Sequence, residues 1–124
     1  MPVINFRPEF AEPVYWGMKR QTIRKVRKRP IAAGDILHLW TGQRTRSNVK
    51  RKLREEICTS VVKVKINYDR FRNIRLRVGA NTIPEDGGVM NQFARNDGFA
   101  TWGDMLEFFL KYYDLPFEGV QIKW

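Results

Sequence analysis

The chain has 124 residues, close to the commonest length of a folded domain, and we expect residues 1–124 to form one domain. A hydrophobic fraction of 43% excludes global disorder. A single cysteine excludes an internal disulfide, and with only one histidine a Cys/His zinc site is excluded too, so we expect no metal and no cofactor. Without a run of 18 apolar residues or an apolar signal segment, the sequence predicts a cytoplasmic protein with no membrane partner.

The positive charge is concentrated in the first 78 residues. The chain carries 23 Lys and Arg against 13 Asp and Glu, a formal net charge of +10. Residues 1–78 hold a net charge of +14, and residues 79–124 hold a net charge of −4. This asymmetry favours a polyanionic partner, nucleic acid or an acidic membrane surface, over a charge that serves only solubility.

The first elements are a short helical segment and a basic strand. Phe6, Phe10 and Val14 recur at helical spacing, and we expect one or two helical turns over residues 8–16, ended at Gly17. Residues 21–26 alternate polar and apolar side chains, which is typical of a strand. Because side chains two apart in a strand share a face, Thr22 and Arg24 are predicted to point the same way.

The middle of the chain is rich in strand patterns. Residues 36–41, 55–66 and 70–78 each predict a strand, the third with a bulge or turn at Arg72 and Asn73. We expect a loop from Gly42 to Asn48. His38 and Cys58 are interpreted as packed structural residues rather than as a proton-transfer group and a nucleophile.

Three basic clusters, over residues 19–29, 44–54 and 70–77, hold 17 of the 23 basic residues. One interpretation is a set of solvated basic loops. The other is a phosphate-binding surface, which we favour because the clusters recur along the chain. The predicted contacts to substrate or nucleic acid are Arg20, Arg24, Arg27, Lys28, Arg29, Arg44, Arg46, Arg75 and Arg77.

The last third predicts two helices and a closing strand. Residues 89–95 form a plausible short helix, with Gly98 suited to its C-terminal cap. Thr101 is expected to cap the next helix, whose apolar side follows Met105, Phe108 and Phe109. Residues 117–124 read as a strand. The fold class is therefore mainly β with flanking helices, with five to six strands in a small barrel and two to three helices.

Several segments together resemble the ASCH family. The motif Gly-x-Lys-x-x-Thr-x-Arg occupies residues 17–24, and Gly34 and Asp35 lead into Leu-His-Leu-Trp-Thr-Gly at residues 37–42. The resemblance continues through Phe-Ala-Arg-Asn-Asp-Gly-Phe at residues 93–99, Met105-x-x-Phe-Phe, and Gly-Val-Gln-Ile-Lys-Trp at residues 119–124. It covers nearly the whole chain and implies a PUA-like fold, a small β-barrel with helices around a cleft.

The family resemblance implies a function related to RNA, in one of three forms. Some members are proposed RNA-binding domains, some small bacterial members are similar to amidohydrolases that deacylate acetylcytidine, and another is described as a ribonuclease. In the amidohydrolase type, the lysine and threonine of the motif act with an acidic residue from the later helical segment. This implies Lys19, Thr22 and Asp97 as the candidate catalytic set, with Asp97 standing where the amidohydrolases have a glutamate.

The residue chemistry leaves binding and catalysis both open. We expect Lys19 at the entrance of a cleft, where burial and the neighbouring Arg20 and Arg24 would lower its pKa and make it a nucleophile or a base. Thr22 could orient a substrate or donate to an oxyanion, and Asp97 could exchange a proton. The alternatives are a solvated lysine and an Asp-Gly turn. We expect recognition of RNA, a nucleotide or a nucleobase, with amide hydrolysis or metal-independent RNA cleavage as alternatives.

Overall fold

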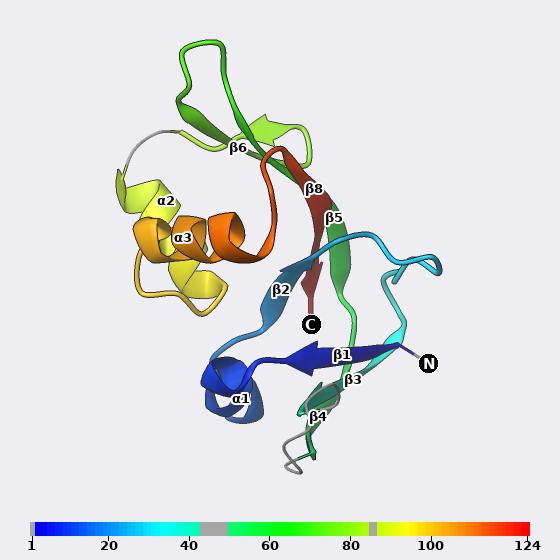
Figure 1. Cartoon of the computed structure of the whole chain (residues 1–124). Helices are drawn as coiled ribbons and strands as arrows, with labels where there is room; N and C mark the ends of the chain where they lie inside the picture. Colours follow the sequence, from blue (N-terminus) through cyan, green and yellow to red (C-terminus); the bar gives the residue numbers. More distant parts are fainter. Residues whose placement is uncertain (1, 43–49, 85–86) are drawn as a thin grey trace.

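The computed structural model describes residues 2–42, 50–84 and 87–124 of the chain (Figure 1). Within this part, eight strands form two sheets and three helices accompany them. The mainly β class with flanking helices is therefore confirmed. The described strands pair as two open sheets, with no closed barrel between them, and they outnumber the five to six that the sequence predicts.

The smaller sheet has the strand order β1-β3-β4. It consists of β1 (Val3–Phe6), β3 (Ile36–Thr41) and β4 (Arg51–Ile57). β1 runs parallel to β3, and β4 runs antiparallel to β3 with a register shift between Leu39 and Trp40. Phe6, which shares a helical spacing with Phe10, lies instead on β1, where it is buried.

The larger sheet is antiparallel throughout, with the order β2-β8-β5-β6-β7. Its strands are β2 (Gln21–Arg24), β8 (Phe117–Lys123), β5 (Ser60–Tyr68), β6 (Ile74–Val78) and β7 (Asn81–Thr82). The closing strand of the chain therefore lies between β2 and β5, and it connects the motif at residues 17–24 to the centre of the sheet.

The three helices are α1 (Pro8–Tyr15), α2 (Gly87–Asn96) and α3 (Trp102–Tyr112). α2 and α3 lie side by side in Figure 1 and pack on the larger sheet, where Met105 and Phe109 join Val64 and Leu76 in one buried cluster. The predicted cap of α3 is confirmed, because Thr101 Oγ1 accepts a hydrogen bond from the backbone N–H of Asp104 at 3.1 Å. No described helix combines the length and the apolar character needed to cross a membrane.

Two predicted strands are wrong in their bounds. The strand expected over residues 55–66 is split at Cys58 and Thr59, where the chain passes from the smaller sheet to the larger one: the Cys58 N–H still bonds to Asp35 O at 2.8 Å, and the Thr59 N–H bonds to Lys123 O at 2.8 Å. β4 also begins earlier than expected, at Arg51, inside the stretch that the sequence assigned to a basic cluster. The strand expected over residues 70–78 begins only at Ile74, because residues 69–73 form a turn in which Arg72 has φ of 62°.

Gly119 is required where β8 passes β2. A Cβ atom added there would lie 2.3 Å from Arg24 O and 2.7 Å from Phe117 Cζ. We expect Gly119→Ala to lower the free energy of unfolding by about 3 kcal/mol, because backbone and a buried ring must move. Gly103→Ala is the matched control, since its nearest atom is at 3.6 Å and alanine favours α3. Urea unfolding measures both, and equal effects would contradict this account of β8.

Candidate functional site

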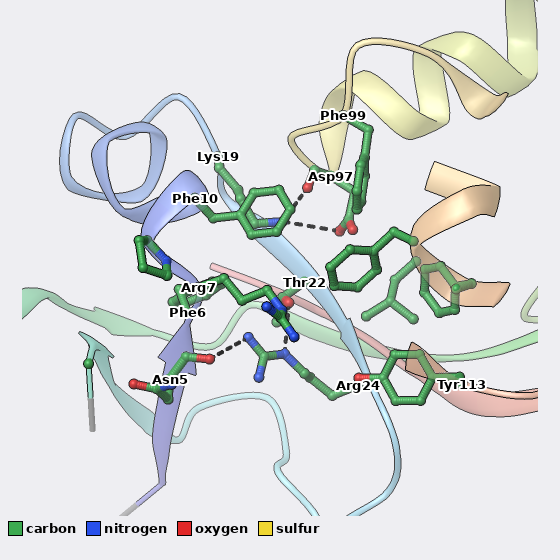
Figure 2. A pocket seen from close by; sticks show the side chains of 15 residues that line it. Asn5, Phe6, Arg7, Phe10, Lys19, Thr22, Arg24, Asp97, Phe99 and Tyr113 are labelled. Atoms are coloured by element: carbon green, nitrogen blue, oxygen red, sulfur yellow. Dashed lines mark hydrogen bonds and ion pairs between the residues drawn. The ribbon is translucent and has the colours of Figure 1, made fainter. Parts of the chain in front are cut away.

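A pocket of about 310 Å³ lies between α1, β2 and the connection from α2 to α3 (Figure 2). Its walls include Lys19, Thr22 and Arg24 from the motif, and Asp97 from the end of α2. Three predicted residues of the motif thus share one cavity with Asp97, which lies more than 70 positions later in the sequence. Aromatic rings from α1 and α3 and from the connection between α2 and α3 complete its lining: Phe10, Phe99, Phe108, Phe109 and Tyr113.

The end of α1 aims the motif into this pocket. Gly17 takes a φ of +75°, which ends the helix as the sequence predicts, and the backbone N–H groups of Met18 and Lys19 both donate to Pro13 O, at 2.8 and 2.9 Å. These bonds satisfy the last turn of the helix and fix the direction of the chain. Lys19, two residues before β2, therefore has its side chain directed toward Asp97.

A glycine also permits the approach of α2 to the motif. Gly98 has a φ of +96°, and a Cβ atom there would lie 3.0 Å from Lys19 Cδ and 3.2 Å from the Phe10 ring. The turn that caps α2 is thus tightly packed against the lysine side chain. The predicted cap is confirmed, and the same turn places the carboxylate of Asp97 in the pocket wall.

Lys19 and Asp97 form a buried pair. Lys19 Nζ lies 3.5 Å from Asp97 Oδ1 and also donates a hydrogen bond to the Asp97 backbone oxygen. The two residues are only 3% and 4% exposed, so the prediction of Lys19 at the cleft entrance is wrong: it lies in the inner wall. Phe10 covers the ammonium group, with its ring centroid 5.0 Å from Nζ.

The environment of the pair disfavours both charges. Burial lowers the pKa of Lys19; the carboxylate of Asp97 opposes this shift, and the positive charge of Arg24 adds to it. Burial raises the pKa of Asp97, opposed chiefly by Lys19. Because the two charges lie so close together, Lys19 and Asp97 titrate as a coupled pair.

Arg24 and Thr22 form a second polar group across the pocket (Figure 2). Arg24 Nε donates to Thr22 Oγ1 at 3.0 Å, so the prediction that the two side chains share a face is confirmed. Arg24 Nη2 donates to Asn5 O at 2.8 Å, and this bond connects β2 of the larger sheet to β1 of the smaller. Because Thr22 accepts from Arg24, its own hydroxyl hydrogen can point to a ligand.

Sequence reasoning missed several pocket residues. Asn5 and Arg7 come from the end of β1 and the start of α1, and Arg7 lies over the Tyr112 ring with Cζ 3.7 Å from its centroid. Phe99 packs on Phe10 at a centroid distance of 5.3 Å. One available signal was Arg7 directly before Pro8, because a strand end followed by a proline-started helix often carries functional side chains.

The other predicted basic residues do not line the pocket. Arg20 Nε donates to Trp124 O at 3.1 Å, Arg27 donates to Val3 O, and Arg75 Nη2 lies 3.0 Å from Asp69 Oδ2. Three of these arginines therefore have structural contacts. Lys28, Arg29 and Arg77 are exposed and lie outside the pocket lining, whereas Arg44 and Arg46 lie outside the described residues.

No family model, curated protein or solved structure matches this chain. Among residues 2–42, 50–84 and 87–124, no group of three or more His, Cys, Asp and Glu side chains could hold a metal ion. His38 lies on β3 outside the pocket, with Nδ1 4.0 Å from Glu55. The polar residues that line the pocket therefore include the Lys19–Asp97 pair, the Arg24–Thr22 pair, Asn5 and Arg7.

Proposed function

We propose that the chain is an ASCH-type domain of PUA-like architecture whose pocket binds the nucleobase of an RNA or a nucleotide. The observation that carries this proposal is the buried Lys19–Asp97 pair inside an aromatic pocket of about 310 Å³. That volume is at the lower end of the range for small-molecule sites, as suits a single base with its sugar. The motif resemblance supports the same conclusion independently.

The lining provides what a base requires. A nucleobase presents flat apolar faces and a polar edge with donors and acceptors. Phe10 and Phe99 supply apolar ring surface, while Lys19 offers donors and Asp97 an acceptor. Arg24 adds positive charge, which favours the phosphate or a carbonyl oxygen of the ligand.

Binding of nucleoside monophosphates tests this proposal. We expect calorimetric titration of the four ribonucleoside 5′-monophosphates to find at least one ligand, and Thr22→Val to weaken it about tenfold by removing one hydrogen bond at nearly constant volume. Thr82→Val is the matched control, because Thr82 is exposed on β7 and outside the pocket lining. If none of the four ligands binds at millimolar concentration, the proposal fails.

One observation also favours hydrolysis of an N-acylated nucleoside. Burial pushes Lys19 toward the neutral amine and Asp97 toward the neutral acid, which are the forms that general base and acid catalysis need. In the proposed reaction, Lys19 takes a proton from water as the water oxygen attacks the acyl carbon. Thr22 donates a hydrogen bond to the oxyanion that forms.

The second half of the reaction returns the proton. The bond between the acyl carbon and the exocyclic nitrogen breaks, and the nitrogen receives a proton from the Lys19–Asp97 pair. The products are a carboxylic acid and the free amino nucleoside, so one water is consumed and no other reactant is needed. Of the two enzymatic alternatives, this one uses the groups that line the pocket, and RNA cleavage gains no comparable support from them.

A further inference from the structure

A second hollow, of about 630 Å³, lies on the larger sheet. Four basic side chains line it: Lys25, directly after β2, Lys63 and Lys65 on β5, and Arg77 on β6. One acidic side chain, Glu118 on β8, also lines it. All four basic side chains are exposed, and they surround an apolar and glycine floor. This surface, hereafter the basic groove, is distinct from the pocket that contains Lys19.

The basic groove lies on the face of the sheet turned away from α2 and α3. Val64 and Ile66 on β5 are buried against these helices, and successive side chains on a strand point to opposite faces. Lys63 and Lys65 therefore point to the other side. At this end of the sheet, one face packs on α2 and α3, and the opposite face exposes Lys63 and Lys65.

The strand register brings like charges together in the basic groove. Lys65 pairs directly with Arg77 on β6, and like charges directly opposite each other destabilise a sheet. Glu118, opposite Lys65 on β8, offsets part of this charge, with Nζ and Oε1 3.4 Å apart. Within the described part of the chain, Lys63 and Arg77 form no ion pair. A bound polyanion would relieve the repulsion.

The basic groove begins where the pocket ends. Lys25 follows Arg24 directly in the chain, and its Nζ lies 5.6 Å from the ring centroid of Tyr113. Both Arg24 and Tyr113 line the pocket, while Lys25 lines the groove. Lys25 thus places positive charge between the pocket and the basic groove.

We propose that the basic groove binds the phosphate backbone of a single-stranded nucleic acid whose unpaired nucleotide occupies the pocket. This inference rests on the proposed function and adds the path of the strand. A pocket of about 310 Å³ has room for one nucleotide, so its neighbours must lie outside it. Lys63 and Lys65 are roughly 6.6 Å apart along β5, comparable to successive phosphates of an extended strand.

The test compares ligand length and salt dependence. Fluorescence anisotropy with oligocytidylates of one to eight nucleotides, as RNA and as DNA, is expected to show affinity rising over the first few nucleotides. Lys63→Ala/Lys65→Ala should reduce the slope of log K against log salt concentration by about 1.4, because each phosphate contact of a single strand contributes about 0.7 to that slope. The same variant should leave the affinity for cytidine monophosphate unchanged. Lys52→Ala/Lys111→Ala removes the same charge from exposed sites elsewhere and should leave the slope unchanged.

The possible contrary results distinguish a failure of the basic groove from a failure of the proposed pocket function. If both double variants lose the same affinity, the effect is one of net charge and the basic groove is not a site. If mononucleotides bind but affinity does not rise with length, the groove fails and the proposed pocket function stands. If oligonucleotides bind through Lys63 and Lys65 while Thr22→Val changes nothing, the pocket function fails and the groove stands. Equal binding of polyglutamate would show a site for acidic protein instead.

Discussion

In Lys19→Ala, we expect the proposed hydrolysis of acetylcytidine to fall by about 10²–10⁴-fold, the usual contribution of a positioned general base. Lys19 Nζ lies 3.5 Å from Asp97 Oδ1 inside the pocket, and the substitution removes the only lysine amine among the described residues that line it. The measurement is the release of cytidine under saturating substrate. Lys111→Ala, an exposed lysine on α3, is the matched control and should retain the full rate.

The pH dependence of this rate should be bell-shaped. The active form holds a single proton on the Lys19–Asp97 pair, so the rate falls in acid when the pair gains a second proton and in alkali when it loses the first. Because the pKa of Asp97 is raised and that of Lys19 is lowered, the acid limb lies above the pKa of an exposed aspartate and the alkaline limb below that of an exposed lysine. No cytidine release at any pH would end the hydrolase proposal.

Asp97→Ala should lower the free energy of unfolding by about 3–5 kcal/mol, the cost of leaving one buried charge without its partner. Lys19 would keep its place beside the Phe10 ring, 3% exposed, with no carboxylate near its ammonium. Lys19→Met/Asp97→Leu removes both charges and should recover to within about 1 kcal/mol of wild type, because apolar replacements of a buried pair are often neutral. Chemical denaturation of wild type, Lys19→Met, Asp97→Leu and the double variant measures the coupling between the two side chains.

The exposed pair of Lys52 and Glu55 supplies the control cycle. Its atoms approach to 3.0 Å, closer than in the buried pair, yet both side chains are exposed to water. We expect a coupling below about 1 kcal/mol there. If the buried pair shows a coupling as small as the exposed one, Lys19 and Asp97 do not depend on each other, and the acid–base role proposed for the pair loses its basis.

Local patterns predicted much of the structure. The twofold period of β2 placed Thr22 and Arg24 on one face, and the Thr101 cap and the glycine ends of α1 and α2 are each encoded within a few residues. Such features depend on neighbours in the sequence. The closeness of Lys19 and Asp97, 78 positions apart, was implied only by the family resemblance, because no local pattern carries it.

The features that were missed depend on contacts distant in the sequence. The parallel pairing of β1 with β3 joins residues more than thirty positions apart, and nothing in the four residues of β1 specifies that partner. The apolar run around Cys58 could not show that the chain changes there from pairing with β3 to pairing with β8. Arg7 lines the pocket beside the Tyr112 ring of α3, a residue 105 positions later, and no local pattern specifies that contact.

The hydrogen bond from Arg24 to Asn5 O connects the two sheets, because Arg24 lies on β2 of the larger sheet and Asn5 on β1 of the smaller one. Arg27 reaches the same strand through Val3 O, so two arginines of the motif region fasten β1 to the segment that begins with β2. A ligand that draws the Arg24 guanidinium toward a phosphate competes with this fastening. Occupancy of the pocket and the relative mobility of the two sheets are therefore linked, and hydrogen exchange in β1 should report on whether the pocket is filled.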